Sequence, residues 1–150
     1  MTRFLPLLLL ASALSAAPID DATFAAVLDI GYAHGVPRSV TRALVMEESG
    51  GDATARSRPT AEGYCSRGLV QIYTRPDNLA YLLENHWPGD PAIFDIDDPR
   101  HNATVGLGYL SELHDRYGNW FQALLFYNCG RVRNAPESTR AYARRIINAL

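Results

Sequence analysis

Apolar residues recur along most of this chain at intervals of three and four, the spacing that places side chains on one face of a helix. No run of alternating polar and apolar residues is long enough to predict a strand with the same clarity. Helices are predicted over residues 20–35, 39–50, 77–86, 99–118, 120–127 and 138–150. Residues 52–67, rich in Ser, Thr, Pro and Gly, are predicted to form a loop. The pattern therefore indicates a mainly α domain.

Capping residues indicate where several of these helices begin. Asp20 or Asp21 is expected to start the first helix, and Ser39 to cap the second. The clearest helix has Asp98 as its cap and Pro99 at its first position. Proline suits that position because its missing N–H would have no partner within the helix. These signals predict helix starts more firmly than periodicity alone.

The apolar faces of the helices predict a core. One face of the 99–118 helix carries Asn102, Gly106, Tyr109, Leu110, Leu113 and Tyr117. Such a stripe ordinarily packs inward. Residues 120–127 are almost entirely apolar, which predicts burial on every side. The last helix is expected to face inward through Tyr142, Ile146 and Leu150.

Length and composition fit one folded domain. The chain has 150 residues, of which 47% are hydrophobic and 10% aromatic, enough apolar material to bury a core. We find no internal repeat, low-complexity tract or linker that would indicate a second domain. The net charge of -2 does not favour a polyanionic partner, so no nucleic acid is expected to bind.

Residues 1–17 differ in composition from the rest of the chain and predict a secretory signal peptide. Arg3 supplies a short positive region, residues 4–14 form a nearly unbroken apolar run, and small residues follow. The run is shorter than the ~18 to 20 residues that span a bilayer. No stable membrane anchor is therefore expected, and an uncleaved anchor is the alternative.

The cleavage position is expected after Ala13 or Ser15. Cleavage after Ala17 is disfavoured because Pro18 would follow it directly. The folded domain is then expected to occupy residues 18–150, in the periplasm or outside the cell.

Glu48 is the candidate for acid–base chemistry. It lies at the C-terminal end of a predicted helix, where the helix dipole is negative, and it shares a face with Leu44 and Val45. Both surroundings disfavour a carboxylate, so the pKa of Glu48 is predicted to be raised. A carboxyl group that stays protonated near neutral pH can deliver a proton to a leaving oxygen. Glu47 points about 100° away around the helix and is expected to be a surface charge; a solvated helix-end glutamate is the alternative for Glu48 itself.

Four separated segments carry a resemblance to a known family. They are Glu48-Ser49 with Ser57 nine positions on, Gly68-Leu69-Val70-Gln71-Ile72, Asn102 with Gly106 and Tyr109-Leu110, and Tyr127-Asn128-Cys129-Gly130. In this order and spacing they resemble the catalytic domain of soluble lytic transglycosylases, over roughly residues 25–147. Each motif alone is weak, but the ordered set is specific.

The resemblance implies a lysozyme-like helical fold with a saccharide-binding groove. It also implies cleavage of the β-1,4 bond between N-acetylmuramic acid and N-acetylglucosamine in peptidoglycan. Glu48 matches the single catalytic acid and base of the family. In that chemistry the glutamate protonates the leaving sugar and then takes a proton from the muramyl C6 hydroxyl, which closes a 1,6-anhydro ring. No metal or organic cofactor is expected.

Five further positions are expected in the substrate groove. Ser57, Gln71 and Asn128 match positions that line the groove, and Tyr127 matches a tyrosine near the glutamate. Tyr73 stands where the family commonly has a methionine near the sugar, and its ring can stack on a pyranose. Plainer alternatives stay open: a surface glutamine, a helix cap at Asn128, and a core tyrosine at 127 with its hydroxyl bonded elsewhere.

The two cysteines form a candidate disulfide. In an oxidising compartment an even count favours pairing, and two small buried side chains are the alternative. Cys65 lies in a segment between Ser57 and Gly68 that is longer than usual for the family, and Cys129 replaces an alanine. Both segments border the site in relatives, so a bridge would join the two walls of the groove.

Histidines and arginines give weaker signals. His34, His86, His101 and His114 lack metal-ligand spacing and are expected to be surface or structural residues. The arginines between residues 131 and 145 form a moderately basic stretch. A solvated face is the plainer interpretation, and a contact for the acidic stem peptides of peptidoglycan is the other.

Two rival functions stay open. A lysozyme-type hydrolase would use water and a second carboxylate about 5 to 9.5 Å from the first. Asp52, Glu62 and Asp77 are available, but none matches a family position. A non-catalytic glycan-binding component is the other rival. In either case the partner is peptidoglycan, and the protein is a candidate component of an envelope-spanning secretion, conjugation or pilus assembly.

Overall fold

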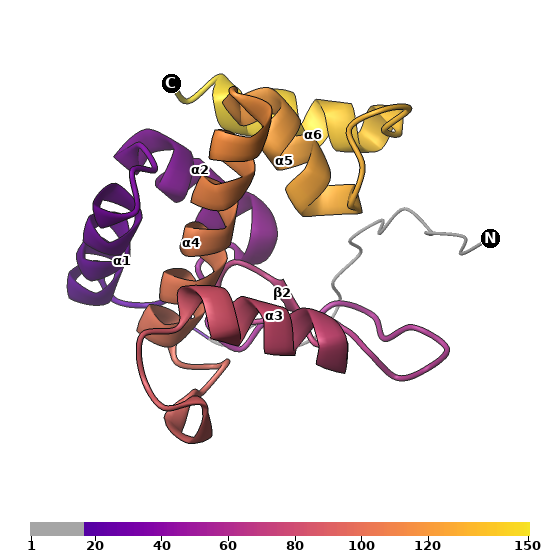
Figure 1. Cartoon of the computed structure of the whole chain (residues 1–150). Coiled ribbons are helices and arrows are strands. Elements are labelled where there is room, and N and C mark those ends of the chain that lie inside the picture. The colour runs from indigo at the N-terminus through magenta and orange to yellow at the C-terminus, as the bar shows by residue number, and fades with distance from the viewer. Residues whose placement is uncertain (1–16) are drawn as a thin grey trace.

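A computed structural model describes residues 17–150, so almost all of the predicted signal peptide lies outside the described residues. Figure 1 shows helices packed around α4, with a short hairpin and α3 below and α5 and α6 above. The helices are α1 (Asp21–Ala33), α2 (Arg38–Ser49), α3 (Pro76–His86), α4 (Pro99–Tyr117), α5 (Trp120–Cys129) and α6 (Glu137–Ile147), with a 3-10 turn at Pro91–Ile93. The strands are β1 (Ser66–Arg67) and β2 (Ile72–Tyr73). The predicted mainly α fold is confirmed.

Two of the predicted helix caps are confirmed and one is wrong. Asp20 caps α1 by accepting from the Thr23 N–H, and Asp98 caps α4 by accepting from the N–H groups of the residues two and three positions on. The prediction of Ser39 as the cap of α2 is wrong. Pro37 holds that position, so Ser39 lies inside the helix. Proline directs the chain into a helix through its fixed φ, and here that suffices without a side-chain cap.

α4 is the central helix and contacts α1, α3 and α5. Leu107, Leu110, Leu113 and Asn102 are fully buried, and Gly106 is buried as well. The two tyrosines of the predicted inward face, Tyr109 and Tyr117, are partly buried. The predicted core stripe is confirmed.

α4 has 19 residues, and no helix within residues 17–150 combines the length and apolar character needed to cross a membrane.

Two burial predictions for the C-terminal helices are wrong. In α5 only Ala123, Leu124 and Leu125 are buried, because the helix lies at the edge of the bundle with one side partly exposed. α6 ends at residue 147, and Leu150 follows it with 64% of its surface exposed. Tyr142 is buried as predicted.

The short antiparallel hairpin of β1 and β2 is attached to α4 through one side chain. Asn102 is fully buried. Its Oδ1 accepts from the Val70 N–H at 2.8 Å, and its Nδ2 donates to the carbonyls of Arg67 and Ile96 at 3.1 and 3.0 Å. At Gly68, φ is +81°, and an added Cβ would lie 2.1 Å from Asn102 Nδ2. Only glycine fits there, which fixes the hairpin against the central helix.

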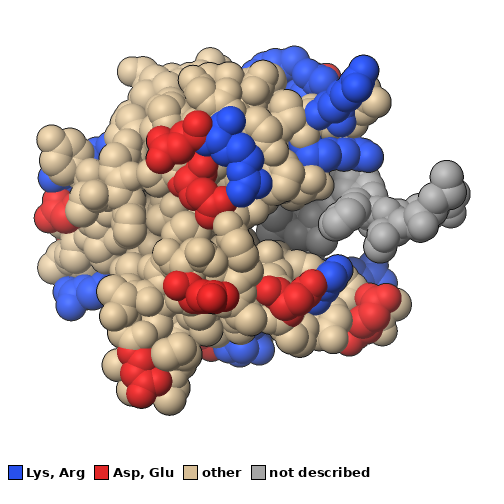
Figure 2. Space-filling model, viewed as in Figure 1, with Lys and Arg blue, Asp and Glu red and all other residues tan. Residues whose placement is uncertain are grey.

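Charged side chains of both signs lie on the surface, and about half of the arginines in residues 17–150 are paired. Figure 2 shows acidic and basic groups side by side over much of the visible face, with basic groups gathered at the upper right, near the ends of α5 and α6. The pairs are Arg38–Asp29, Arg56–Asp97, Arg67–Asp97, Arg75–Asp77, Arg116–Glu112, Arg144–Glu137 and Arg145–Glu47.

Candidate active site

Glu48 is buried in the last turn of α2. Only 8% of its surface is exposed. The helix ends directly after it, where Gly50 takes a left-handed conformation and donates its N–H to the Met46 carbonyl. Leu44 and Val45, on the same helix, are fully buried. The carboxyl group therefore lies in apolar surroundings at the end of a helix, as the sequence predicted.

Burial raises the pKa of Glu48 from 4.5 to about 7. Loss of hydration penalises the charged carboxylate, and this is the largest cause. A hydrogen bond from Tyr142 opposes it by favouring the charged form, and the negative charge of Glu47 adds a smaller upward push. The predicted raised pKa is confirmed. The carboxyl group is poised to exist in both protonation states near neutral pH.

The tyrosine that contacts the glutamate is Tyr142 of α6. Its hydroxyl donates to Glu48 Oε1. Tyr127, the tyrosine expected near the glutamate, donates to the Val70 carbonyl at 2.7 Å. This matches the alternative of a core tyrosine with its hydroxyl bonded elsewhere. Tyr127 still lies near, because the charge of Glu48 contributes to the rise in the pKa of its phenol. Sequence reasoning placed Tyr142 only in the core, on the inward face of the last helix. Its contact with Glu48 follows from the packing of α6 on α2, which the sequence did not indicate.

Gln71 has a structural role in the hairpin turn. Its backbone is left-handed, with φ of 55°, and its Nε2 donates to the carbonyls of Ala55 and Gly68 at 3.1 and 2.9 Å. The side chain thus ties the turn to the preceding loop. Its Oε1 makes no hydrogen bond to any residue in 17–150, so one acceptor stays available for a ligand.

Ser57 is buried and also holds the loop to the hairpin. Its Oγ accepts from the Ser66 N–H at 2.8 Å, and its own N–H donates to the Ser66 carbonyl at 2.9 Å. The long segment between Ser57 and the hairpin is mostly exposed. Tyr73, in β2, is partly exposed and sits across the hairpin from Ser66. These contacts place Ser57 and Tyr73 beside the same hairpin.

Asn128 is exposed in the last turn of α5 and faces α6. Its Oδ1 accepts from the Thr139 hydroxyl at 2.8 Å. The cap of α5 is Gly130, which is left-handed, so the interpretation of Asn128 as the cap is wrong. Thr139 lies one helical turn before Tyr142, and α6 therefore links Asn128 to the surroundings of Glu48.

Cys65 and Cys129 are free thiols in the structure, not the predicted disulfide. Cys129, at the end of α5, directs its Sγ toward the Arg131 carbonyl at 3.3 Å. Cys65 precedes β1, and its backbone is bonded to Thr74. Each thiol is partly buried in its own segment. The hairpin is therefore attached to the helices by the hydrogen bonds of Asn102 and not by a disulfide.

None of the three alternative carboxylates forms a hydrogen bond with Glu48 within residues 17–150. Asp52 is buried, but its Oδ1 accepts from the N–H and the hydroxyl of Thr54 at 2.8 and 2.9 Å, which closes a local turn. Glu62 is exposed in the long loop. Asp77 is exposed and paired with Arg75. None of the three forms a hydrogen bond with residues that contact Glu48.

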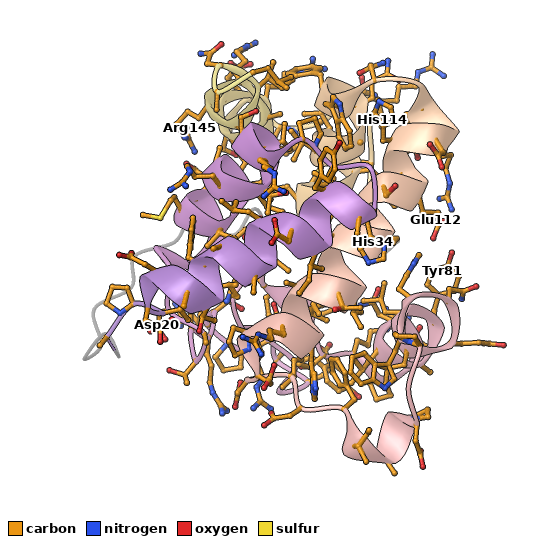
Figure 3. The ribbon with its side chains drawn as sticks, turned by 90° about the vertical axis from the view of Figure 1, so that its left-hand side faces the viewer. Asp20, His34, Tyr81, Glu112, His114 and Arg145 are labelled. Carbon is orange, nitrogen blue, oxygen red and sulfur yellow. The ribbon has the colours of Figure 1, made fainter. Side chains whose placement is uncertain are left out.

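Two of the histidines lie on another side of α4, where His34, His86 and Glu112 help to line a hollow of about 510 Å³. Figure 3 shows His34, Glu112 and Tyr81 on the same side of the molecule, and Glu112 accepts from Tyr81 and lies 3.0 Å from His86 Nε2. No group of three potential ligands within residues 17–150 could hold a metal ion. All four histidines are partly buried.

The surroundings of two glycines show that this hollow and the region around Glu48 lie on different faces of α4. A Cβ at Gly106 would meet Val70 and the Tyr127 hydroxyl, whereas a Cβ at Gly108 would meet His86 and His34. Residues two apart point to nearly opposite faces of a helix. The Glu48 side of α4 therefore gathers Tyr127, Tyr142 and the hairpin, and it is the candidate active site.

Residues 26–150 match a family model described as the transglycosylase SLT domain. Among similar proteins are those named endo-type membrane-bound lytic murein transglycosylase A. The Cronobacter sakazakii protein is 31% identical over 83 residues, which cover 55% of this chain and 38% of that protein. The Citrobacter koseri protein is 30% identical over the same length, and the Klebsiella pneumoniae protein 28% identical over 85 residues. The match covers only 38 to 39% of these relatives.

Proposed function

Since the chain belongs to the transglycosylase SLT domain family, we propose that it cleaves the β-1,4 bond between N-acetylmuramic acid and N-acetylglucosamine in murein. One observation carries this proposal: a buried carboxyl group, Glu48, with a pKa of about 7, sits among apolar side chains and accepts a hydrogen bond from one tyrosine. A group with that pKa can give up a proton and take one back at neutral pH, which is what one residue acting as both acid and base requires.

In the proposed reaction, protonated Glu48 gives its proton to the glycosidic oxygen as the bond from that oxygen to muramyl C1 breaks. The N-acetylglucosamine end leaves as an alcohol. The resulting carboxylate then takes the proton of the muramyl C6 hydroxyl while O6 bonds to C1. The product carries a 1,6-anhydro ring, and Glu48 returns to its protonated form without any water being consumed. The Tyr142 hydroxyl holds the carboxyl group in place through both steps.

The surroundings of Glu48 favour this route over hydrolysis. A hydrolase needs a second carboxylate at a set distance, either as nucleophile or to activate water. Asp52 accepts two hydrogen bonds from Thr54, Asp77 is paired with Arg75, and Glu62 is exposed in the loop; within residues 17–150 none of the three is hydrogen-bonded to Glu48 or Tyr142. The internal C6 hydroxyl of the substrate removes the need for such a group. Lysozyme-type hydrolysis is therefore the second candidate.

The substrate groove is proposed to run past the hairpin and the end of α5. Gln71 offers its free Oε1 to sugar hydroxyl or amide donors, and Asn128 offers its exposed amide. Tyr73 is placed to stack on a pyranose ring. Ser57 and Tyr127 act by holding the hairpin from which these groups project.

The proposed site of action is the cell wall, after export through the signal peptide expected in residues 1–17. The relatives' printed name places those proteins at membranes and calls them endo-type. For this chain we propose a periplasmic or secreted enzyme. An assembly that crosses the envelope, for secretion, conjugation or pilus growth, is its proposed partner, because such an assembly needs a local opening in murein.

Mass spectrometry of the fragments released from purified murein tests the proposal. We expect muropeptides that end in 1,6-anhydro-N-acetylmuramic acid. Reducing ends would instead establish the hydrolase. No release of fragments by the parent protein, with glycan binding intact, would establish the non-catalytic component. Glu48→Gln is the control that ties any released fragment to the proposed acid.

A further inference from the structure

A group of arginines without acidic partners lies beside the candidate groove. The segment of residues 130–140 comprises the connection from α5 to α6 and the first turn of α6, and it contains Arg131, Arg133 and Arg140. Their one acidic residue, Glu137, is paired with Arg144. Within residues 17–150, none of the three arginines of this segment forms an ion pair.

Two of these arginines are free to bind a ligand. Arg131 and Arg133 are exposed, and their guanidinium groups make no hydrogen bond to any residue in 17–150. Arg140 is partly buried and donates to the Ala135 carbonyl at 3.2 Å, which holds the segment to α6. Figure 2 shows basic groups gathered at this end of the molecule, where Figure 1 places the segment between α5 and α6.

Two hydrogen bonds connect the surroundings of this segment to the proposed catalytic carboxyl group. The segment begins two residues after Asn128, which accepts from Thr139 of α6. Tyr142, three residues after Thr139, contacts Glu48. Three residues of helix rise about 4.5 Å. A glycan held at Asn128 and Glu48 would therefore carry its side groups past Arg131 and Arg133.

The chemistry of murein indicates what those side groups are. In a peptide-bearing strand the lactyl carboxyl of N-acetylmuramic acid is an amide, so the two sugars are uncharged and the free carboxylates belong to the stem peptide. A guanidinium group matches a carboxylate with two parallel hydrogen bonds. We propose that Arg131 and Arg133 bind the carboxylates of stem peptides, so that the protein prefers peptide-bearing glycan strands to peptide-free strands. This inference rests on the proposed action on murein.

Binding measured without turnover tests the inference separately from catalysis. Fluorescently labelled glycan strands of matched length are prepared with their stem peptides and after enzymatic removal of the peptides. The lactyl carboxylates that this removal exposes are then converted to amides, so the peptide-free strands are uncharged. In a Glu48→Gln background, adding Arg131→Gln and Arg133→Gln is expected to weaken binding to peptide-bearing strands by about three- to tenfold, the range for two exposed ion pairs. Binding to peptide-free strands should change less than about twofold.

The matched control removes two exposed arginines elsewhere. Arg38→Gln with Arg75→Gln changes the net charge equally but alters arginines that are already paired with Asp29 and Asp77. This control should bind both strands as the Glu48→Gln protein does. The selective loss should shrink in 0.5 M salt, since exposed charges are then screened.

Three results would overturn the inference. The first is equal affinity of the Glu48→Gln protein for the two kinds of strand. The second is that the double arginine variant loses affinity equally for both. The third is that the arginines are needed for binding to vesicles rich in anionic lipid, while their removal causes no selective loss of affinity for peptide-bearing strands. Failure of the proposed function looks different. The parent would then release no anhydro fragments, while the preference for peptide-bearing strands would still depend on Arg131 and Arg133.

Discussion

The Tyr142 hydroxyl donates a hydrogen bond to Glu48 across a separation of 94 residues in sequence. This contact joins α2 to α6, the two helices that close the Glu48 side of the molecule. It supplies the polar partner that a buried carboxyl group needs in either protonation state. It also limits the rise in the pKa of Glu48, because a donated hydrogen bond favours the charged form.

Removing that hydroxyl should move the pH profile of activity. In Tyr142→Phe the pKa of Glu48 is expected to rise further, so the decline of kcat/KM with increasing pH should shift to higher pH. The loss of positioning should lower kcat by about ten- to a hundredfold. A rate profile between pH 5 and 9 measures both effects. A decline that moved to lower pH would contradict the assigned role.

Tyr127→Phe is the matched variant for that experiment. The hydroxyl of Tyr127 donates to the Val70 carbonyl, not to Glu48, so the pH profile should stay in place. The unpaired carbonyl should lower the free energy of unfolding by about 1 to 3 kcal/mol. If Tyr127→Phe shifted the profile as much as Tyr142→Phe, the hydrogen-bond assignment at this site would be wrong.

Glu48→Gln should abolish cleavage and leave the fold intact. The amide keeps the shape of the side chain but cannot donate the proton, and general acid catalysis is worth about 10² to 10⁴ in rate. Glu47→Gln should retain turnover within a few-fold, because Glu47 lies at the surface paired with Arg145. Fragment release from labelled murein compares the two. Equal activity of Glu48→Gln and the parent would remove Glu48 from the mechanism.

The same substitution should change how stability depends on pH. In the folded protein the pKa of Glu48 is about 7, above its ordinary value of 4.5. Between these values the folded state holds a proton that the unfolded chain releases, so the free energy of unfolding falls as pH rises through this window. The difference between the two values corresponds to about 3 kcal/mol, present in full below pH 4.5 and lost above pH 7. Urea unfolding at pH 4.5 and 8 should show this loss in the parent and not in Glu48→Gln; equal losses in both would place its source elsewhere.

The sequence predicted the helices because their signals are local. Asp20 and Asp98 cap helices through bonds to residues at most three positions away, and the stripe on α4 needs only helical periodicity. It predicted burial of Glu48 in the same way, from two apolar neighbours on its helix. Ser39 failed as a cap because proline alone starts α2.

The contacts between segments were beyond sequence reasoning. Strands of two residues leave no alternating pattern, so the hairpin could not be predicted. Whether Tyr127 or Tyr142 contacts Glu48 depends on how α5 and α6 pack against α2, which neither helix encodes alone. Gln71 resembled an exposed ligand-binding residue, yet its amide nitrogen is committed to two backbone carbonyls of its own loop.

Asn102 should contribute more to stability than other asparagines. Asn102→Ala removes three hydrogen bonds from a fully buried site and leaves the Val70 N–H without its partner. A loss of about 3 to 5 kcal/mol is expected, in the range of a broken buried network. Asn85→Ala is the control, because Asn85 is exposed and bonds only within its helix; it should change stability by less than about 0.5 kcal/mol. Similar losses in both variants would mean that the hairpin does not depend on Asn102.

Two substitutions at Gln71 separate its structural role from substrate binding. Both Gln71→Ala and Gln71→Gly remove the bonds to Ala55 and Gly68, but only glycine relieves the left-handed backbone at φ of 55°. The glycine variant should therefore be the more stable of the two by about 1 kcal/mol. Both lack the Oε1 acceptor, so KM for glycan strands should rise by a similar factor in each, whatever their difference in stability. If KM followed stability instead, rising in the alanine variant and staying at the parent value in the glycine variant, Gln71 would serve the loop alone and the groove would bind sugar without it.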